Sequence, residues 1–316
     1  MPIRPAHRRL LLSCYALMLT NWLPVHSLAQ TLSESVDKIV ATGGAVPAGS
    51  GPFIHGFNAS LGTSSQHDSS NGWSSVLTPG VSYRINRAFS INASVPIYAY
   101  INIYENTGTK AKPVYHYITK NGVTGDTALT ASYEAPLHWF GYEGFVTLGL
   151  PSGNTAYGLG AGQPTYDLNN HFEKDLGIFT PDIELGIGDS SALVDSAVRK
   201  SYTSVGTIAH FQAGSSVDLP FDMNFEADAY EVLPLGAQTI YSTTGKGKKK
   251  ATTATGESSG EDNGFITSLD IPLNPHVVLS GFYNRSLRDH DDVAGFSFVF
   301  QLRALPKHSE SKAFLK

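Results

Sequence analysis

The stretch FSINASVPIYAYINIY, residues 89–104, keeps a two-residue period over sixteen residues. Apolar side chains fill every odd position, whereas the even positions carry serine, asparagine, proline or tyrosine. Successive side chains of a strand point to opposite faces, but a helix would scatter this pattern around its axis, so the stretch predicts a strand. Its length exceeds the ~5–6 residues of an ordinary strand and the ~9–11 that cross a bilayer. A transmembrane β-barrel is therefore favoured over a soluble sandwich.

Composition agrees with an all-β membrane protein. The 316 residues include 31 glycines, 15 tyrosines and 16 phenylalanines, which suits tight turns and aromatic girdles. No run approaches the roughly 18 apolar residues of a transmembrane helix, and the mean hydropathy is only −0.11. A barrel escapes this requirement because only alternate residues face lipid. No Pro/Ser-rich linker divides the chain, which predicts one domain.

The N-terminal residues 1–29 have the pattern of an export signal. Three arginines precede the apolar run LLLSCYALML (10–19), and the small-residue sequence SLA stands just before Gln30. A lipoprotein signal is the alternative, since LLSC (11–14) resembles a lipobox. Cleavage after Ala29 removes the single cysteine and three of the 22 basic residues, which leaves 19 basic against 27 acidic residues. Neither a disulfide framework nor nucleic-acid binding is expected of such a chain.

Alternating segments predict about twelve strands in all. They are 53–62, 73–86, 89–104, 123–135, 140–150, 163–172, 179–188, 202–217, 221–232, 265–271, 276–287 and 293–302. Short turns follow the second, fourth, eighth and tenth strands, and longer polar loops are expected at 63–72, 105–122, 151–162, 189–200 and 242–263. Short periplasmic turns that alternate with longer extracellular loops are typical of outer-membrane barrels.

The predicted fold class is therefore all-β: a single antiparallel transmembrane β-barrel of outer-membrane type in the bacterial outer membrane. Residues 30–52 would form a periplasmic N-terminal segment, 53–302 the barrel, and 303–316 a periplasmic C-terminal tail. An even number of strands places both termini on the periplasmic side. The last strand, with Phe296, Phe298, Phe300 and Leu302 on one face, is similar to the closing strand that the barrel-assembly machinery recognises.

A family resemblance appears in GVTGDTALTASYEAP followed by GFVTLGLPSGNTAYGLGAGQPTYDLN. This part of the chain, about 120–170, resembles the outer-membrane barrel family named for the MetA pathway of phenol degradation, whose members pair a Gly-Asp strand start with a glycine-rich hairpin. The resemblance implies a barrel transporter for hydrophobic or aromatic compounds. The segment NNHFEKDLGIF (169–179) departs from the family's glycine-rich strand.

The side chains expected to line the pore are polar and, taken together, acidic. They are Ser82, Arg84, Asn92, Tyr98, Tyr100, Asn102, Tyr104, Asp126, Glu134, Asp182, Glu184, Asp222, Asn224, Glu226, Asp228 and Tyr230, with Ser90, Ser94 and Glu143 on the same predicted face. Carboxylates favour cations or neutral polar solutes over anions, and tyrosines offer a surface for aromatic solutes. The sequence thus predicts a channel for passive or facilitated uptake of a small solute, without catalytic residues, metal or other cofactor. Its other expected partners are outer-membrane lipids, lipopolysaccharide and the barrel-assembly machinery.

Two other functions stay open at this point. A small barrel can fill its interior with a hydrogen-bonded network and conduct nothing. QHDSSNGWSS (66–75) resembles the active-site segment of outer-membrane phospholipase, and His67 could act as general base for Ser69, which makes a lipid-modifying enzyme the second alternative. The polar loop chemistry of that stretch explains it without catalysis.

Two charged stretches have ordinary explanations. The lysines of GKGKKK (245–250) could bind lipopolysaccharide phosphates, but a solvated loop has the same composition. RDHDD (288–292) could coordinate a metal, but a polar hairpin tip accounts for it equally well.

Overall fold

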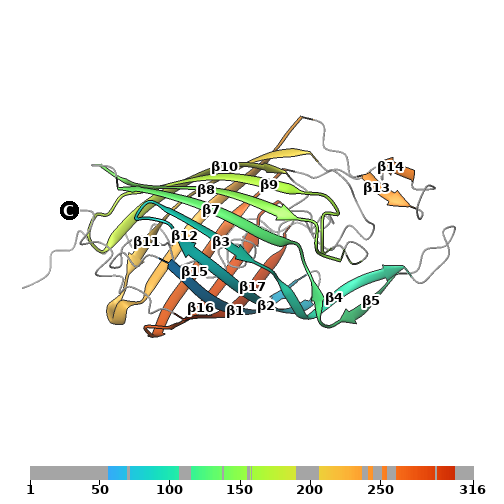
Figure 1. Ribbon diagram of the computed structural model, residues 1–316, viewed down its shortest axis with the longest axis horizontal. Helices are drawn as coiled ribbons and strands as arrows, with labels where there is room; N and C mark the ends of the chain where they lie inside the picture. The colour runs from blue at the N-terminus through green and yellow to red at the C-terminus, as the bar shows by residue number, and fades with distance from the viewer. Residues whose placement is uncertain are drawn as a thin grey trace, which may run out of the picture.

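The computed structural model describes residues 56–69, 72–106, 115–136, 139–154, 157, 159–189, 206–236, 241–244, 251–254, 261–288 and 290–302. Within them, twelve antiparallel strands close into a barrel, as the sequence predicts (Figure 1). Around the ring these are β1 (Gly56–Asp68), β2 (Gly72–Arg84), β3 (Phe89–Ser94), β7 (Thr127–Pro136), β8 (Gly141–Leu150), β9 (Thr165–Glu173), β10 (Phe179–Asp189), β11 (Thr207–Asp218), β12 (Asn224–Leu235), β15 (Asp262–Asn274), β16 (Val277–Ser286) and β17 (Asp292–Gln301). Pairing of β1 with both β17 and β2 closes the ring.

Five other strands are present among the described residues. β4 (Ile97–Asn106) continues β3 and pairs with β5 (Tyr115–Lys120) and β6 (Val123–Thr124), while β13 (Tyr241–Thr244) pairs with β14 (Ala251–Ala254). None of the described residues forms a helix long and apolar enough to cross a membrane. The predicted signal, the 30–52 segment and the 303–316 tail lie outside the described residues.

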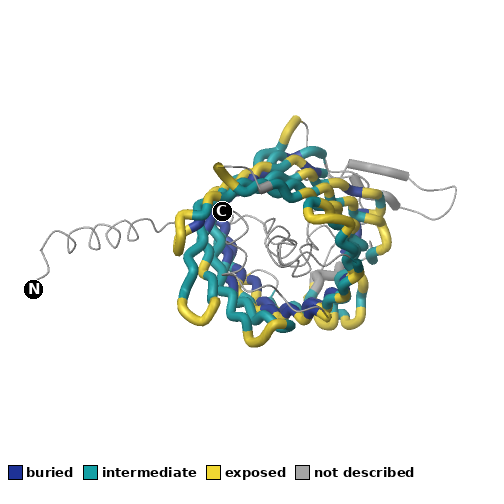
Figure 2. Tube along the Cα trace, turned by 60° about the vertical axis from the view of Figure 1, so that its left-hand side comes forward, coloured by how far each residue is buried: buried dark blue, intermediate teal, exposed yellow. Residues whose placement is uncertain are grey.

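The two faces of the barrel wall differ as the alternation predicts. Many side chains on the outer face are large, apolar and exposed, for example Phe57 at 72 %, Ile183 at 51 % and Phe298 at 39 %. Buried residues lie on the inner face of the ring (Figure 2), and many of them are polar, such as Ser64 and Thr78. Because a closed barrel pairs every strand edge, such an apolar exterior can face hydrocarbon without unsatisfied backbone groups. The chain is a barrel of outer-membrane type, which resides in the bacterial outer membrane.

Connections at the two ends of the barrel differ in length. One end, here called the turn end, holds the start of β1, the end of β17 and the turns 85–88, 137–140, 174–178, 219–223 and 275–276. The opposite loop end holds the longer connections 151–164, 190–206 and 236–261. The prediction of a polar loop at 63–72 is wrong, because β1 continues to Asp68 and only residues 69–71 join β1 to β2. Cross-strand partners for this segment on both β2 and β17 explain its extended form.

The sixteen-residue stretch that predicted the fold is two strands instead of one. β3 ends at Ser94, β4 begins at Ile97, and Pro96 between them has no N–H for a ladder. Within β4 the pairing with β2 then shifts by one residue, so that Tyr98 pairs with Val76 but Tyr100 pairs with Ser75. Ala99 is thus an extra residue in the ladder, and the inward and outward faces of β4 exchange beyond it.

Candidate solute pathway in the barrel lumen

Carboxylates on the inner wall gather on β7 to β12. Glu134 pairs across the strands with Glu143, Glu143 with His171, and His171 with Glu184, so these four side chains form one row on the inner face. Directly paired residues of antiparallel strands share a face, with Cβ atoms about 5 Å apart. Imidazole nitrogens of His171 lie 3.7 Å from Glu184 and 3.9 Å from Glu173 carboxylate oxygens. The row therefore brings several acidic groups together around one histidine.

One arginine partly balances this row at the turn end. The Arg84 guanidinium lies 3.1 Å from a Glu134 carboxylate oxygen, and it also donates to the backbone carbonyl of Arg87 at 3.0 Å. This ion pair bridges β2 and β7 across the intervening β3. It orients Glu134 and leaves the rest of the row dominated by carboxylates.

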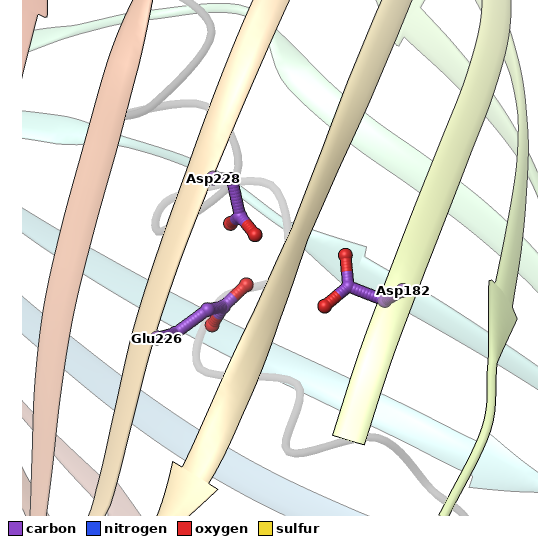
Figure 3. A group of neighbouring side chains, drawn as sticks. All are labelled: Asp182, Glu226 and Asp228. Carbon is purple, nitrogen blue, oxygen red and sulfur yellow. The ribbon is translucent and has the colours of Figure 1, made fainter. Parts of the chain in front are cut away.

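A second acidic group, the carboxylate triad of Asp182, Glu226 and Asp228, lies beside this row (Figure 3). One oxygen from each carboxylate lies within 4.8 Å of the others. Asp182 on β10 and Asp228 on β12 both pair with Gly214 of the intervening β11. A Cβ on Gly214 would lie 2.7 Å from the Asp228 Cα and would overlap the carboxylate, so the missing side chain lets the acidic groups approach one another.

The triad has the ligand chemistry of a cation site. Three carboxylates supply the hard oxygen ligands that Ca²⁺ or Mg²⁺ prefers. Asp228 is almost fully buried, and its second carboxylate oxygen accepts a hydrogen bond from the Gln212 amide at 2.6 Å. Among the residues that the structure describes, these three are the group whose geometry could hold a metal ion.

Hydrogen bonds fix the inner side chains nearer the loop end. The Asp262 carboxylate accepts from the Tyr230 hydroxyl at 3.0 Å and from the Ser286 hydroxyl at 2.6 Å. His210 contacts Asp167 at 2.9 Å between ring nitrogen and carboxylate oxygen. Tyr230, Asp262, Ser286 and His210 are buried, and each group is held by its own hydrogen bonds, so they form a fixed polar wall.

The opposite part of the wall, from β17 round to β3, is mostly uncharged on its inner face. It carries hydroxyl, amide and small apolar side chains, among them Ser60, Ser64, Thr78, Ser82, Asn92, Ser94, Ser297 and Val299. The lumen is thus asymmetric, with an acidic wall facing a mostly uncharged one. A solute inside would meet charge on one side and uncharged hydrogen-bonding groups on the other.

Most of the predicted lining residues lie on the inner face. The strand register places Ser82, Arg84, Asn92, Tyr98, Glu134, Asp182, Glu184, Asn224, Glu226, Asp228 and Tyr230 there, together with Ser90, Ser94 and Glu143. The side chain of Tyr104 lies outside the described residues.

Four other predicted lining residues lie elsewhere. Tyr100 pairs with Ser75, on the same face as Trp73 and Leu77, so the extra residue in β4 turns Tyr100 and Asn102 outward. Asp222 belongs to an exposed 3₁₀ turn, Pro220–Asp222, because β12 begins only at Asn224. Asp126 uses both carboxylate oxygens to accept backbone N–H groups of the β8–β9 connection, at 2.7 Å each.

Several residues on the inner face of the barrel were not predicted from the sequence. Asp167, Asn169, His171 and Glu173 occupy alternate positions of β9, a strand whose period looked weak because Asn170 interrupts its outer face. Asn170 is satisfied there, since it accepts from the Tyr142 hydroxyl at 2.8 Å. Alternation of the four polar residues was the signal that could have identified them. Gln212 and Asp262 carried no comparable signal.

The geometry around Ser69 does not assemble a catalytic pair with His67. The Ser69 hydroxyl donates to an Asp291 carboxylate oxygen and accepts from the Asp292 backbone N–H at 3.0 Å. His67 lies on the outer face, where its ring makes an edge contact with Trp73 at 5.2 Å between centroids. Ser69 therefore joins the β1–β2 turn to the β16–β17 connection.

The acidic residues after Arg288 also have partners within the fold. Asp292 makes an ion pair with Arg285 at 2.9 Å, and Asp291 accepts from Ser69. Asp289 and the lysines of GKGKKK lie outside the described residues.

Comparison with known proteins shows that the chain shares its fold with a solved outer membrane channel. No family model matches the chain, and no curated protein does. An outer membrane channel from Pseudomonas putida F1 is similar in structure, with a TM-score of 0.52 and 12 % identity over 80 % of this chain and 97 % of that one. The toluene transporter TbuX of Ralstonia pickettii gives a TM-score of 0.47 and 9 % identity over 84 % and 94 % of the two chains. At these identities the first likeness supports the barrel fold and the second carries no further argument.

Proposed function

We propose that the protein is an outer-membrane channel for passive or facilitated passage of small solutes, with a preference for cations and neutral polar or aromatic molecules over anions. The observation that carries this proposal is the acidic inner wall of β7 to β12, which faces a mostly uncharged wall across the lumen. Rings or rows of carboxylates raise the local concentration of cations and repel anions. A structural filler would gain nothing from so many like charges placed side by side, because their mutual repulsion is unfavourable.

Two further observations support transport. The Pseudomonas putida protein with the same fold is itself an outer membrane channel. The resemblance of residues 120–170 to the MetA-pathway family supports aromatic solutes. We also propose that the barrel-assembly machinery inserts the chain and that lipopolysaccharide surrounds its outer half.

Ion selectivity in planar bilayers tests this function. Under a KCl gradient the purified protein should give a reversal potential of the sign for cation preference. Replacing the carboxylate triad (Asp182→Asn, Glu226→Gln, Asp228→Asn) should move that potential toward zero, because lumen substitutions tune selectivity. Glu231→Gln is the matched control, since Glu231 pairs with Phe211 on the outer face of β12 and its loss should leave selectivity unchanged.

Two results would contradict the proposal. Anion preference in the parent protein would mean that the carboxylates do not control the pathway. Absence of conductance from correctly folded barrels would favour a closed structural barrel.

A further inference from the structure

The described residues of the connection between β8 and β9, which are 151–154, 157 and 159–164, are held by the Gly-Asp step that precedes β7. Asp126 accepts the backbone N–H of Gly153 on one carboxylate oxygen and that of Ala161 on the other, each at 2.7 Å. Asn154 donates its backbone N–H to the Thr124 carbonyl at 3.0 Å. One carboxylate thus ties together two points of the loop that are eight residues apart in sequence.

Glycines make this close approach possible. A Cβ on Gly153 would lie 2.7 Å from the backbone nitrogen of Asp126, and a Cβ on Gly160 would lie 2.8 Å from the Asp126 carboxylate. Real Cβ atoms do not come this close, so a side chain at either position would push the loop away from Asp126. The Gly-Asp and glycine-rich segments therefore form one structural unit.

The loop packs on the inner side of the barrel wall at the loop end. Leu159 and Ile101 are each only 7 % exposed and pack against each other, with Tyr98 and Val123 around them. Tyr98 and Ile101 pair with Val76 and Ser74 of β2, which lie on the inner face. Exchange of the faces within β4 is what turns Ile101 inward, toward Leu159.

A cation–π contact adds to this packing. The Lys120 ammonium lies 4.7 Å from the centre of the Tyr157 ring, and Tyr157 packs against the same apolar cluster. Such contacts contribute about 0.5–1 kcal/mol at exposed sites. The loop is therefore fixed to β4 by apolar contacts and to the start of β7 by the Asp126 hydrogen bonds.

We propose that Asp126 is a positioning residue that holds the β8–β9 loop across the inner side of β4 and thereby narrows the lumen at its loop end. Release of the loop from Asp126 widens this end of the pathway, so the conductance depends on a residue that does not itself line the pathway. The inference rests on the proposed channel function for its effect on conductance, but the position of the loop can be tested without it.

Labelling of a buried reporter tests the position of the loop. The predicted cleavage after Ala29 would leave a chain without cysteine, so Ile101→Cys would provide a single thiol beneath Leu159. Adding Asp126→Asn should raise the maleimide labelling rate about tenfold, which corresponds to ~1.4 kcal/mol and suits the loss of a hydrogen bond to a charged acceptor. Gly160→Ala should act in the same direction, because it displaces the loop while keeping the carboxylate.

Asp175→Asn is the matched control. Asp175 also accepts a backbone N–H, from Gly177 at 2.7 Å, but in the β9–β10 turn at the opposite end of the barrel. It should leave the labelling rate unchanged. Retained heat-modifiable migration on denaturing gels would establish that each variant is folded.

Single-channel recording of the same variants completes the test. Raised labelling together with a larger conductance for Asp126→Asn and Gly160→Ala supports the proposal. Unchanged labelling in both folded variants would overturn it, and so would raised labelling with unchanged conductance in a conducting parent. If labelling rises but neither parent nor variant conducts, Asp126 does hold the loop and the channel function is wrong.

Discussion

Arginine at Ile183 should destabilise the barrel strongly, because this residue points into the hydrocarbon near the middle of the membrane. Ile183 is 51 % exposed on the outer face of β10. It lies four residues after Phe179 and six before Asp189, the ends of the strand. At about 3.3 Å per residue and a tilt of about 40°, each residue adds about 2.5 Å of height. The side chain thus lies about 10 Å from one end and 15 Å from the other.

The depth of Ile183 in the membrane determines how much stability the arginine should cost. An arginine at the midplane of a barrel costs about 2–4 kcal/mol, and the cost falls to about 0–1 kcal/mol near the interfaces. Ile183→Arg should therefore lower the folding equilibrium constant about 30- to 1,000-fold. Gln212→Arg is the matched control on the neighbouring β11, since Gln212 faces inward, pairs with Glu184 and donates a hydrogen bond to Asp228. Arginine there meets carboxylates and water, so the cost should stay below about 1 kcal/mol.

Urea titration of both variants in lipid vesicles measures the difference. Folded and unfolded populations can be followed by heat-modifiable migration, and the free energies compared with the parent protein. Equal costs for the two arginines would refute the assignment of faces on β10 and β11. A small cost at Ile183 alone would mean that this part of β10 lies outside the hydrocarbon region.

Two further changes test the lumen and the enzyme alternative. Gly214→Ala should reduce cation preference in bilayer recordings, because the added Cβ displaces Asp228 from the triad; unchanged selectivity in a folded variant would contradict the role of this gap. Ser69→Ala should cost about 1 kcal/mol of stability through its lost hydrogen bonds, with no phospholipid hydrolysis by either the parent or the variant. Fatty-acid release that depends on Ser69 would restore the phospholipase hypothesis.

The barrel was predictable because lipid favours apolar side chains on the outer face of most strands. The alternation therefore survives even where the residues differ, as in the outward Phe296, Phe298 and Phe300 of β17. β9 was the exception, because Asn170 stands among the outward residues and is satisfied by Tyr142 and the Leu185 carbonyl. Such local satisfaction depends on the neighbouring strands and is not visible in one segment.

The face of the barrel wall on which a side chain lies was harder to predict than the position of each strand in the sequence. A single extra residue, Ala99, reverses the faces for the rest of β4, and the sequence pattern continues through it unchanged. As a result Tyr100 points outward although its neighbour Tyr98 points inward. Ile101 is an apolar residue on the inner face, and it stays there because the β8–β9 loop covers it. The apparent sixteen-residue strand thus contains two environments, lipid and a packed loop, that both accept aliphatic side chains.

The positions of the acidic side chains depend on glycines of neighbouring segments. Asp182 and Asp228 belong to strands that are not neighbours, and they approach each other only because Gly214 stands between them. Asp126 likewise reaches two N–H groups because Gly153 and Gly160 leave space. The acidic residues are visible in the sequence, but their spatial grouping is not. Glycines on other segments determine which carboxylates form the triad and which one holds the β8–β9 loop. The proposed selectivity and the proposed access through the lumen therefore rest on separate acidic groups, and substitution of the intervening glycines should alter each independently.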